Sequence, residues 1–190
     1  LQLHAWETYL AGHNAALNDR VLARMYGRRL IDAAEAVVDM LGLELDAATV
    51  AAERDAVFLA LVPGAVGPMP GAHELLATLS SRPVKLALAT SGHRRYVDLA
   101  LESAGLPRVF EVEVTGELVE RGKPAPDTFL AAASALETPP SACLVLEDSP
   151  NGVLAAKAAG AWCFGVLGHA SERELRQAGA ERLRGVGGRR

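Results

Sequence analysis

The chain has 190 residues, 50% of them hydrophobic and 22% charged, a composition typical of a soluble globular protein with one core or a core and a modest second unit. A net charge of −4 and an aromatic content of 5% argue against a nucleic-acid-binding protein. No uninterrupted apolar segment approaches the ~18 residues of a membrane span, so we expect neither a membrane nor a nucleic acid as a partner.

The first third of the chain has the pattern of helices. Apolar residues recur at helical spacing over residues 1–62, and nothing in this stretch alternates with a period of two. Gly42 is placed to end one helix, and Asp46 is placed to cap the next. The proline- and glycine-rich stretch that follows indicates a hinge. We therefore predict an α-helical domain over residues 1–66 and a second domain over residues 67–190.

After the hinge, strands alternate with helices. Short apolar segments predict strands over residues 84–90, 110–114, 142–147 and 162–166. Helices are predicted over residues 73–79, 94–104, 126–136 and 151–159, and from Ser171, where Ser171 and Glu174 form a capping box. This alternation indicates right-handed crossovers. The predicted fold class is α/β, a Rossmann-like open parallel sheet preceded by an α-helical unit.

Cysteine and arginine usage gives two smaller predictions. The two cysteines, Cys143 and Cys163, each fall in an apolar run, which is more typical of small core residues than of a disulfide or a metal site. The reducing cytoplasm is therefore the expected compartment. Four arginines gather near the end of the chain, and the glycines among them favour a solvated tail: Arg182, Arg184, Arg189 and Arg190.

Polar residues directly after the predicted strands are the candidates for a site, because open α/β sheets bind ligands beyond the carboxyl ends of their strands. Thr90 ends the first predicted strand, and Ser91 and Gly92 follow it and precede a helix. Backbone N–H groups and the helix dipole would make this position a cradle for an anion. Ser91 as a simple helix cap is the alternative, and for this stretch taken alone it is the better interpretation.

A lysine and two acids follow the next two predicted strands. Lys123 lies in a loop stiffened by Pro124 and Pro126, where a lysine would be a fixed charge for a phosphate oxygen or a carboxylate. An ordinary loop lysine is the alternative. Glu147 and Asp148 end what the pattern predicts to be a buried strand, where adjacent carboxylates are costly unless a cation or a proton separates them. Oxygen ligands with room for water and phosphate suit Mg²⁺.

The acid pair has a competing explanation, in which Asp148 caps the next helix and Glu147 is solvated. Ser149 followed by Pro150 already forms a good helix start, which weakens this explanation. Asn151 and Gly152 could add polar contacts there. Hydroxyls, lysine and acids thus follow three successive strands on one edge of the sheet. Together they predict a phosphate-binding, Mg²⁺-dependent site for a small phosphorylated metabolite.

Three segments of the chain resemble motifs of the haloacid dehalogenase superfamily. Thr90-Ser91, GKPAPDTF and LEDSPNGVLAAKAAG resemble its second, third and fourth motifs, and the helical N-terminal third resembles its helical cap. More narrowly, these segments resemble the subfamily that has a helical cap, which includes the β-phosphoglucomutase-like phosphatases. The resemblance implies that Thr90 and the Ser91 backbone hold the phosphoryl group and that Lys123 neutralises charge. It also implies that Asp148 binds Mg²⁺, with Glu147 assisting directly or through water.

The first motif of the superfamily, an apolar strand followed by Asp-x-Asp-Gly, is absent from the chain. No two of its aspartates lie two positions apart. In the family the first of these aspartates forms an aspartyl-phosphate, and the strand before it is central in the sheet. We therefore expect the sequence to be a fragment or to have a misassigned start, with the nucleophile upstream of Leu1. As written, the chain is expected to be inactive.

Several alternatives stay open. The protein could be a β-phosphoglucomutase-like phosphomutase, or a non-catalytic, truncated pseudoenzyme that binds phosphate or metal through Lys123 and Asp148. A dehalogenase of the same superfamily is disfavoured, because that branch does not need magnesium and the pair of Glu147 and Asp148 would have no role. Sugar phosphates, nucleotides and glycolate-type compounds all remain candidate substrates, and the oligomeric state is open.

Overall fold

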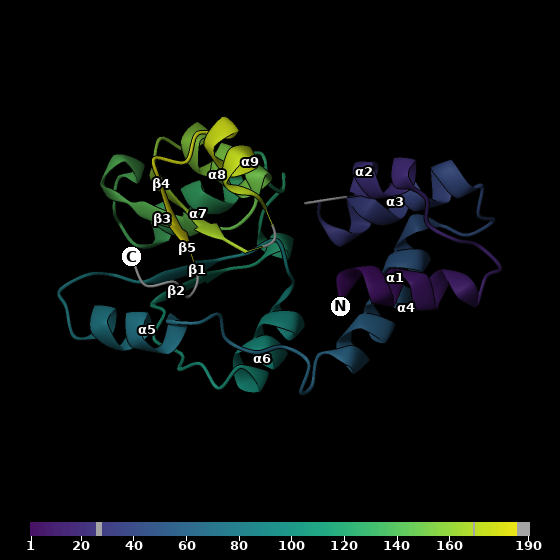
Figure 1. Ribbon diagram of the computed structural model, residues 1–190, viewed down its shortest axis with the longest axis horizontal. Coiled ribbons are helices and arrows are strands. Elements are labelled where there is room, and N and C mark those ends of the chain that lie inside the picture. Colours follow the sequence, from purple (N-terminus) through teal and green to yellow (C-terminus); the bar gives the residue numbers. More distant parts are fainter. Residues whose placement is uncertain (26–27, 169, 186–190) are drawn as a thin grey trace. The chain divides into compact units, whose positions relative to one another are not determined.

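The computed structural model describes residues 1–25, 28–168 and 170–185. These residues form two compact units (Figure 1). One unit comprises Leu1–Gly67 with Arg95–Gly105, and the other comprises Pro68–Arg94 with the chain from Leu106 onward. All the strands of the described residues belong to the second unit.

The first unit is entirely helical. Its helices are α1 (Gln2–Ala11), α2 (Asp19–Met25), α3 (Leu30–Leu41) and α4 (Ala47–Leu61), joined by most of α6 (Arg94–Ser103). The predicted helix boundaries are confirmed where capping chemistry marked them. Gly42 ends α3 in the left-handed conformation, and the Asp46 carboxylate accepts a hydrogen bond from Thr49 N at 2.9 Å. The main core of this unit includes Trp6, Leu10 and Val37.

The second unit is the predicted parallel α/β structure. Its strands are β1 (Ala87–Ala89), β2 (Val112–Val114), β3 (Leu144–Glu147), β4 (Trp162–Leu167) and β5 (Arg182–Gly185). Its α-helices are α5 (Ala72–Ser80), α7 (Asp127–Ala135), α8 (Pro150–Ala158) and α9 (Glu172–Gln177), with short 3-10 turns η1 (Gly116–Leu118) and η2 (Pro140–Ala142). The capping box of Ser171 and Glu174 at the start of α9 is confirmed.

The strands form two sheets instead of one continuous sheet. β1 pairs with β2, and β3 pairs with β4, which pairs with β5; every one of these pairs is parallel. Within the described residues, β1 and β3 therefore each have one edge without a strand partner.

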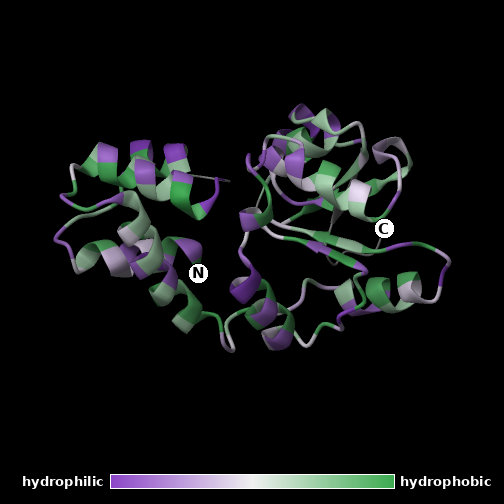
Figure 2. Cartoon of the chain, turned by 180° about the vertical axis from the view of Figure 1, so that it is seen from behind, coloured by the Kyte–Doolittle hydropathy of each residue, from purple (hydrophilic) through white to green (hydrophobic). Residues whose placement is uncertain are grey.

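The three-stranded sheet is covered on one face. Helices α7, α8 and α9 supply that cover, and Phe129, Val153 and Leu175 are buried with Cys163 of β4. On the other face Leu144, Leu146 and Trp162 are 53%, 47% and 58% exposed. The strands are mostly hydrophobic in Figure 2. The prediction of a buried strand was thus wrong for one face of β3, because no layer of described residues covers that face.

Three smaller expectations have mixed outcomes. The predicted solvated tail is wrong for residues 182–185, whose backbone forms β5 beside β4; Arg189 and Arg190 lie outside the described residues. Both cysteines are free thiols, with Cys163 buried and Cys143 partly buried. No helix within the described ranges is both long and apolar enough to cross a membrane.

Candidate active site

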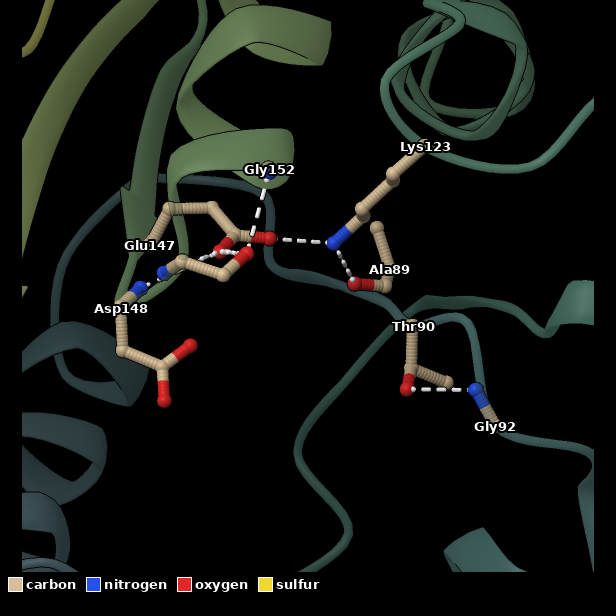
Figure 3. Close-up of polar contacts among 8 residues, drawn as sticks. Ala89, Thr90, Gly92, Lys123, Glu147, Asp148 and Gly152 are labelled. Atoms are coloured by element: carbon tan, nitrogen blue, oxygen red, sulfur yellow. Dashed lines mark hydrogen bonds and ion pairs between the residues drawn. The ribbon is translucent and has the colours of Figure 1, made fainter. Parts of the chain in front are cut away.

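Lys123 joins the carboxyl ends of β1 and β3. Its Nζ donates to the backbone oxygen of Ala89 at 3.3 Å and forms an ion pair with the Glu147 carboxylate (Figure 3). Both charged side chains are only 8% exposed. The ammonium also lies 4.6 Å from the centre of the Phe129 ring, a favourable position for a cation. Because Thr90 directly follows Ala89, Lys123 brings together the loop after β1, its own loop and the end of β3, which the sequence predicted to form one site.

Glu147 is held by backbone and side-chain donors at the start of α8. One carboxylate oxygen accepts from Lys123. The other accepts from Asp148 N at 3.1 Å, Ser149 N at 3.2 Å and Ser149 Oγ at 3.0 Å. A helix N-terminus with its free N–H groups stabilises a carboxylate. Glu147 is therefore a fixed counter-charge for Lys123 and is not a solvated acid.

The prediction that Ser149 caps α8 is confirmed. Ser149 Oγ accepts from Gly152 N at 3.0 Å, and Pro150 occupies the first turn. Asn151, a predicted phosphate-binding residue, lies in the same first turn and is partly buried. Asp148 is thus not needed as the cap, and its carboxylate points away from the pair of Glu147 and Lys123 in Figure 3.

Gly152, which the sequence marked only for a polar contact at the helix start, has a packing role in the site. A Cβ atom built on it would lie 1.9 Å from Glu147 Cδ and 2.1 Å from both carboxylate oxygens. Only glycine leaves room for this carboxylate under α8. The available signal was a glycine in the first turn of a helix, where it costs about 1 kcal/mol relative to alanine and so needs a packing reason.

The loop of Thr90, Ser91 and Gly92 has its own internal hydrogen bond. Thr90 Oγ1 accepts from Gly92 N at 3.0 Å (Figure 3). The N–H of Arg94, at the start of α6, is capped by the carboxylate of Glu117 at 3.1 and 3.2 Å. Ser91 was the helix cap that the sequence favoured, whereas in the structure the carboxylate of Glu117, a residue beyond β2, accepts from Arg94 N.

The donor chemistry of the site fits Mg²⁺ with a short list of protein ligands. The described residues contain no group of three or more His, Cys, Asp or Glu side chains arranged to hold a metal. Mg²⁺ commonly keeps several waters and binds through one or two carboxylates plus substrate phosphate. Asp148 suits such a role. Glu147 suits it less, because protein donors already engage both of its oxygens.

The α/β core places a buried lysine and paired acids at its strand ends, where open α/β sheets bind ligands. The chain matches the haloacid dehalogenase-like hydrolase family over residues 4–160 and belongs to that family. In structure it is similar to a hydrolase from Pseudomonas syringae, with a TM-score of 0.83 and 30% identity over 96% of this chain and 84% of that chain.

Two relatives are phosphatases by name. Validoxylamine A 7'-phosphate phosphatase from Streptomyces hygroscopicus subsp. limoneus is 39% identical over 165 residues, which are 85% of this chain and 76% of that protein. The mitochondrial (DL)-glycerol-3-phosphatase 1 of Arabidopsis thaliana is 38% identical over 162 residues, which are 81% of this chain but only 54% of the plant protein.

Proposed function

We propose that the protein is a Mg²⁺-dependent phosphoric monoester hydrolase that acts on a small phosphorylated metabolite. The phosphatase names of two relatives support this class of reaction. The reaction would proceed through an aspartyl-phosphate whose aspartate lies upstream of Leu1. The helical domain, residues 1–66, would serve as the cap that selects the substrate, and residues 67–190 would form the core.

The observation that carries this proposal is the position of Lys123. Its buried ammonium contacts Ala89 at the end of β1 and Glu147 at the end of β3. A cation fixed between two strand ends, with Thr90 and Asp148 as the next residues on either side, is well placed to neutralise a phosphoryl group. Phosphoryl transfer depends mainly on such positioning and charge neutralisation.

The open edges of β1 and β3 support a nucleophile on an additional strand. β1 and β3 each pair on one side only within the described residues. Unpaired backbone N–H and C=O groups on buried strands cost folding free energy, and a strand between β1 and β3 would supply hydrogen-bond partners to both edges. In a parallel sheet such a strand would end at the same edge as Thr90 and Asp148, so that an aspartate after it would face Lys123.

Each residue of the site would have a distinct task. Thr90, with its hydroxyl hydrogen available to donate while its oxygen accepts from Gly92 N, would bind a phosphoryl oxygen together with the Ser91 backbone. Lys123 would offset the charge of the phosphoryl group and the nucleophile. Glu147 would keep Lys123 oriented, and Asp148 would hold Mg²⁺. Bound Mg²⁺ would add charge stabilisation at the phosphoryl oxygens.

The test is a comparison of the natural full-length protein with the 190-residue chain. Both would be assayed for phosphate release from sugar phosphates, glycerol phosphate, nucleotides and phosphoglycolate, with Mg²⁺ and with EDTA. We expect Mg²⁺-dependent release by the full-length protein and none by the shorter chain. Mass spectrometry of the full-length protein should locate a phosphorylated aspartate in the upstream segment.

Other outcomes would contradict parts of the proposal. A folded full-length protein that releases phosphate from none of these compounds, yet binds phosphate or Mg²⁺, would identify a non-catalytic binding protein. Movement of phosphate between two positions of one sugar phosphate would identify a phosphomutase. Activity of the 190-residue chain itself would rule out an upstream nucleophile.

A further inference from the structure

The turn that follows β2 runs against the loop that follows β1. We call residues 115–117 the β2 turn. Thr90 N donates to Val114 O at 2.9 Å, just before this turn, and Gly116 N donates to the backbone oxygen of Gly92 at 2.8 Å. The carboxylate of Glu117 then accepts from Arg94 N. Contacts at residues 90, 92 and 94 thus hold the loop along its whole length.

Gly116 makes the closest of these approaches. A Cβ atom on Gly116 would lie 2.3 Å from the backbone oxygen of Ser91 and 2.9 Å from its carbonyl carbon. Gly116 is itself buried, so a side chain there has no solvent to turn into. The clash is with backbone atoms and cannot be relieved by a side-chain rotation. Any other residue at this position would therefore displace Ser91.

Arg94, at the start of α6, is fixed by its side chain as well as by its backbone. The guanidinium of Arg94 pairs with the carboxylate of Glu113 on β2, a side chain that is only 13% exposed. Arg108 lies 3.6 Å from the same carboxylate. Arg94 is therefore tied to β2, and the loop has little freedom to move away from the β2 turn.

We infer that Gly116 and Glu117 are positioning residues for the phosphoryl-binding loop. Neither residue belongs to the motifs that carried the family resemblance. The inference rests on the proposed function, because it assumes that Thr90 and the Ser91 backbone hold the phosphoryl group. Gly116 permits the loop to approach β2, and Glu117 holds the start of α6 so that the loop keeps its shape.

The size of the effect follows from the geometry. With alanine at position 116, Ser91 O must retreat by about 0.7 Å to reach 3.0 Å, the shortest separation that real Cβ atoms show. Catalytic groups need placement within about 0.5 Å, and a 1 Å error can cost about 100-fold in rate. We expect Gly116→Ala to lower kcat by about 10- to 100-fold and to weaken inhibition by inorganic phosphate by at least about 10-fold.

The experiment uses the natural full-length protein and its variants Gly116→Ala and Glu117→Gln. Glu117 is exposed, so its substitution should leave the fold intact even if Gly116→Ala does not fold. Glu117→Gln removes the charge but keeps an acceptor, and it should lower kcat by about 3- to 10-fold, the size of losing one charge-assisted hydrogen bond. The Mg²⁺ concentration for half-maximal activity should not change, because Asp148 follows a different strand, β3.

Two matched controls separate positioning from general destabilisation. Gly67→Ala adds a Cβ that meets nothing within 4 Å, and Glu102→Gln removes an exposed charge elsewhere on α6. Both should retain wild-type kinetics. A purely structural role of Gly116 would lower the melting temperature but leave the phosphate inhibition constant of the folded enzyme unchanged.

The outcomes distinguish this inference from the proposed function. If the wild-type protein releases phosphate and the folded variants match it in kcat and in phosphate inhibition, the inference is wrong and the proposed function stands. If the wild-type protein neither releases nor binds phosphate, the proposed function fails and the inference fails with it.

Discussion

Replacing Gly152 by alanine is the sharpest test of how the acid pair is built. Helix propensity alone predicts that this substitution stabilises α8 by up to about 1 kcal/mol. The structure predicts the opposite sign. The new Cβ would lie 1.9 Å from Glu147 Cδ, and the carboxylate must move by about 1.1 Å to reach the 3.0 Å limit for real Cβ atoms.

That displacement breaks a buried ion pair. Glu147 and Lys123 are each 8% exposed, so water cannot readily replace the lost partner. Removing the partner of a buried charge typically costs about 3–5 kcal/mol. For a chain of this size, 1 kcal/mol corresponds to about 2–4 °C in melting temperature, and we expect a decrease of about 6–20 °C. Thermal and urea unfolding of Gly152→Ala beside wild type would measure it.

Two further variants make the result interpretable. Gly67→Ala, where the Cβ meets open space, should unfold within about 0.5 kcal/mol of wild type. In a Glu147→Ala background the clash is gone, so Gly152→Ala should then be neutral or stabilising, and the double-mutant cycle should show strong coupling. A single variant as stable as wild type, or more stable, would refute the packing argument.

Three other predictions follow from groups outside or around this contact. Burial, assisted by a hydrogen bond to Glu53, raises the pKa of Tyr9 to about 12. Above about pH 10 the unfolded state loses the phenol proton, whereas the folded state keeps it. The free energy of unfolding should therefore fall as pH rises from about 10 to 12. Urea unfolding at stepped pH should show this slope, and Tyr9→Phe should remove it. Burial likewise raises the pKa of the Cys163 thiol to about 12, so a thiol reagent at mild pH should modify Cys143 much faster, with both thiols reacting only after denaturation. Lys123→Met should cost about 3–5 kcal/mol in unfolding free energy because it leaves Glu147 buried and unpaired, whereas Lys157→Met, at a more exposed pair, should cost under about 1 kcal/mol; equal losses would contradict the burial argument.

Local chemistry made several parts of the fold predictable from the sequence. Gly42, Asp46, Ser149 and Ser171 mark helix ends through their own backbone preferences or side-chain hydrogen bonds, and those ends lie where the pattern put them. The α/β class was predictable for a similar reason, because alternating apolar strands and amphipathic helices can bury their apolar faces in few ways.

Contacts between distant segments could not be predicted in this way. Nothing local indicates that Glu117 caps α6, because the partner of Arg94 N lies 23 residues away. Gly116 and Gly152 look like ordinary turn and helix residues until the atoms that face them are known. The sequence marked Glu147 as a candidate metal ligand, and only the fold revealed that its two oxygens are engaged by Lys123 and the start of α8.

Apart from β5, the sequence by itself thus determined the main elements, their order and the residues that end the strands, because these depend on periodicity and on neighbours within a few positions. The tertiary structure decided which of those strand ends meet, which glycines permit the meeting and which edges stay open. The physical reason is the separation along the chain of the residues that interact. Hydrogen-bonded caps and amphipathic patterns are properties of a short segment. The ion pair of Lys123 and Glu147, and the open edges of β1 and β3, exist only once segments far apart in the chain have packed together.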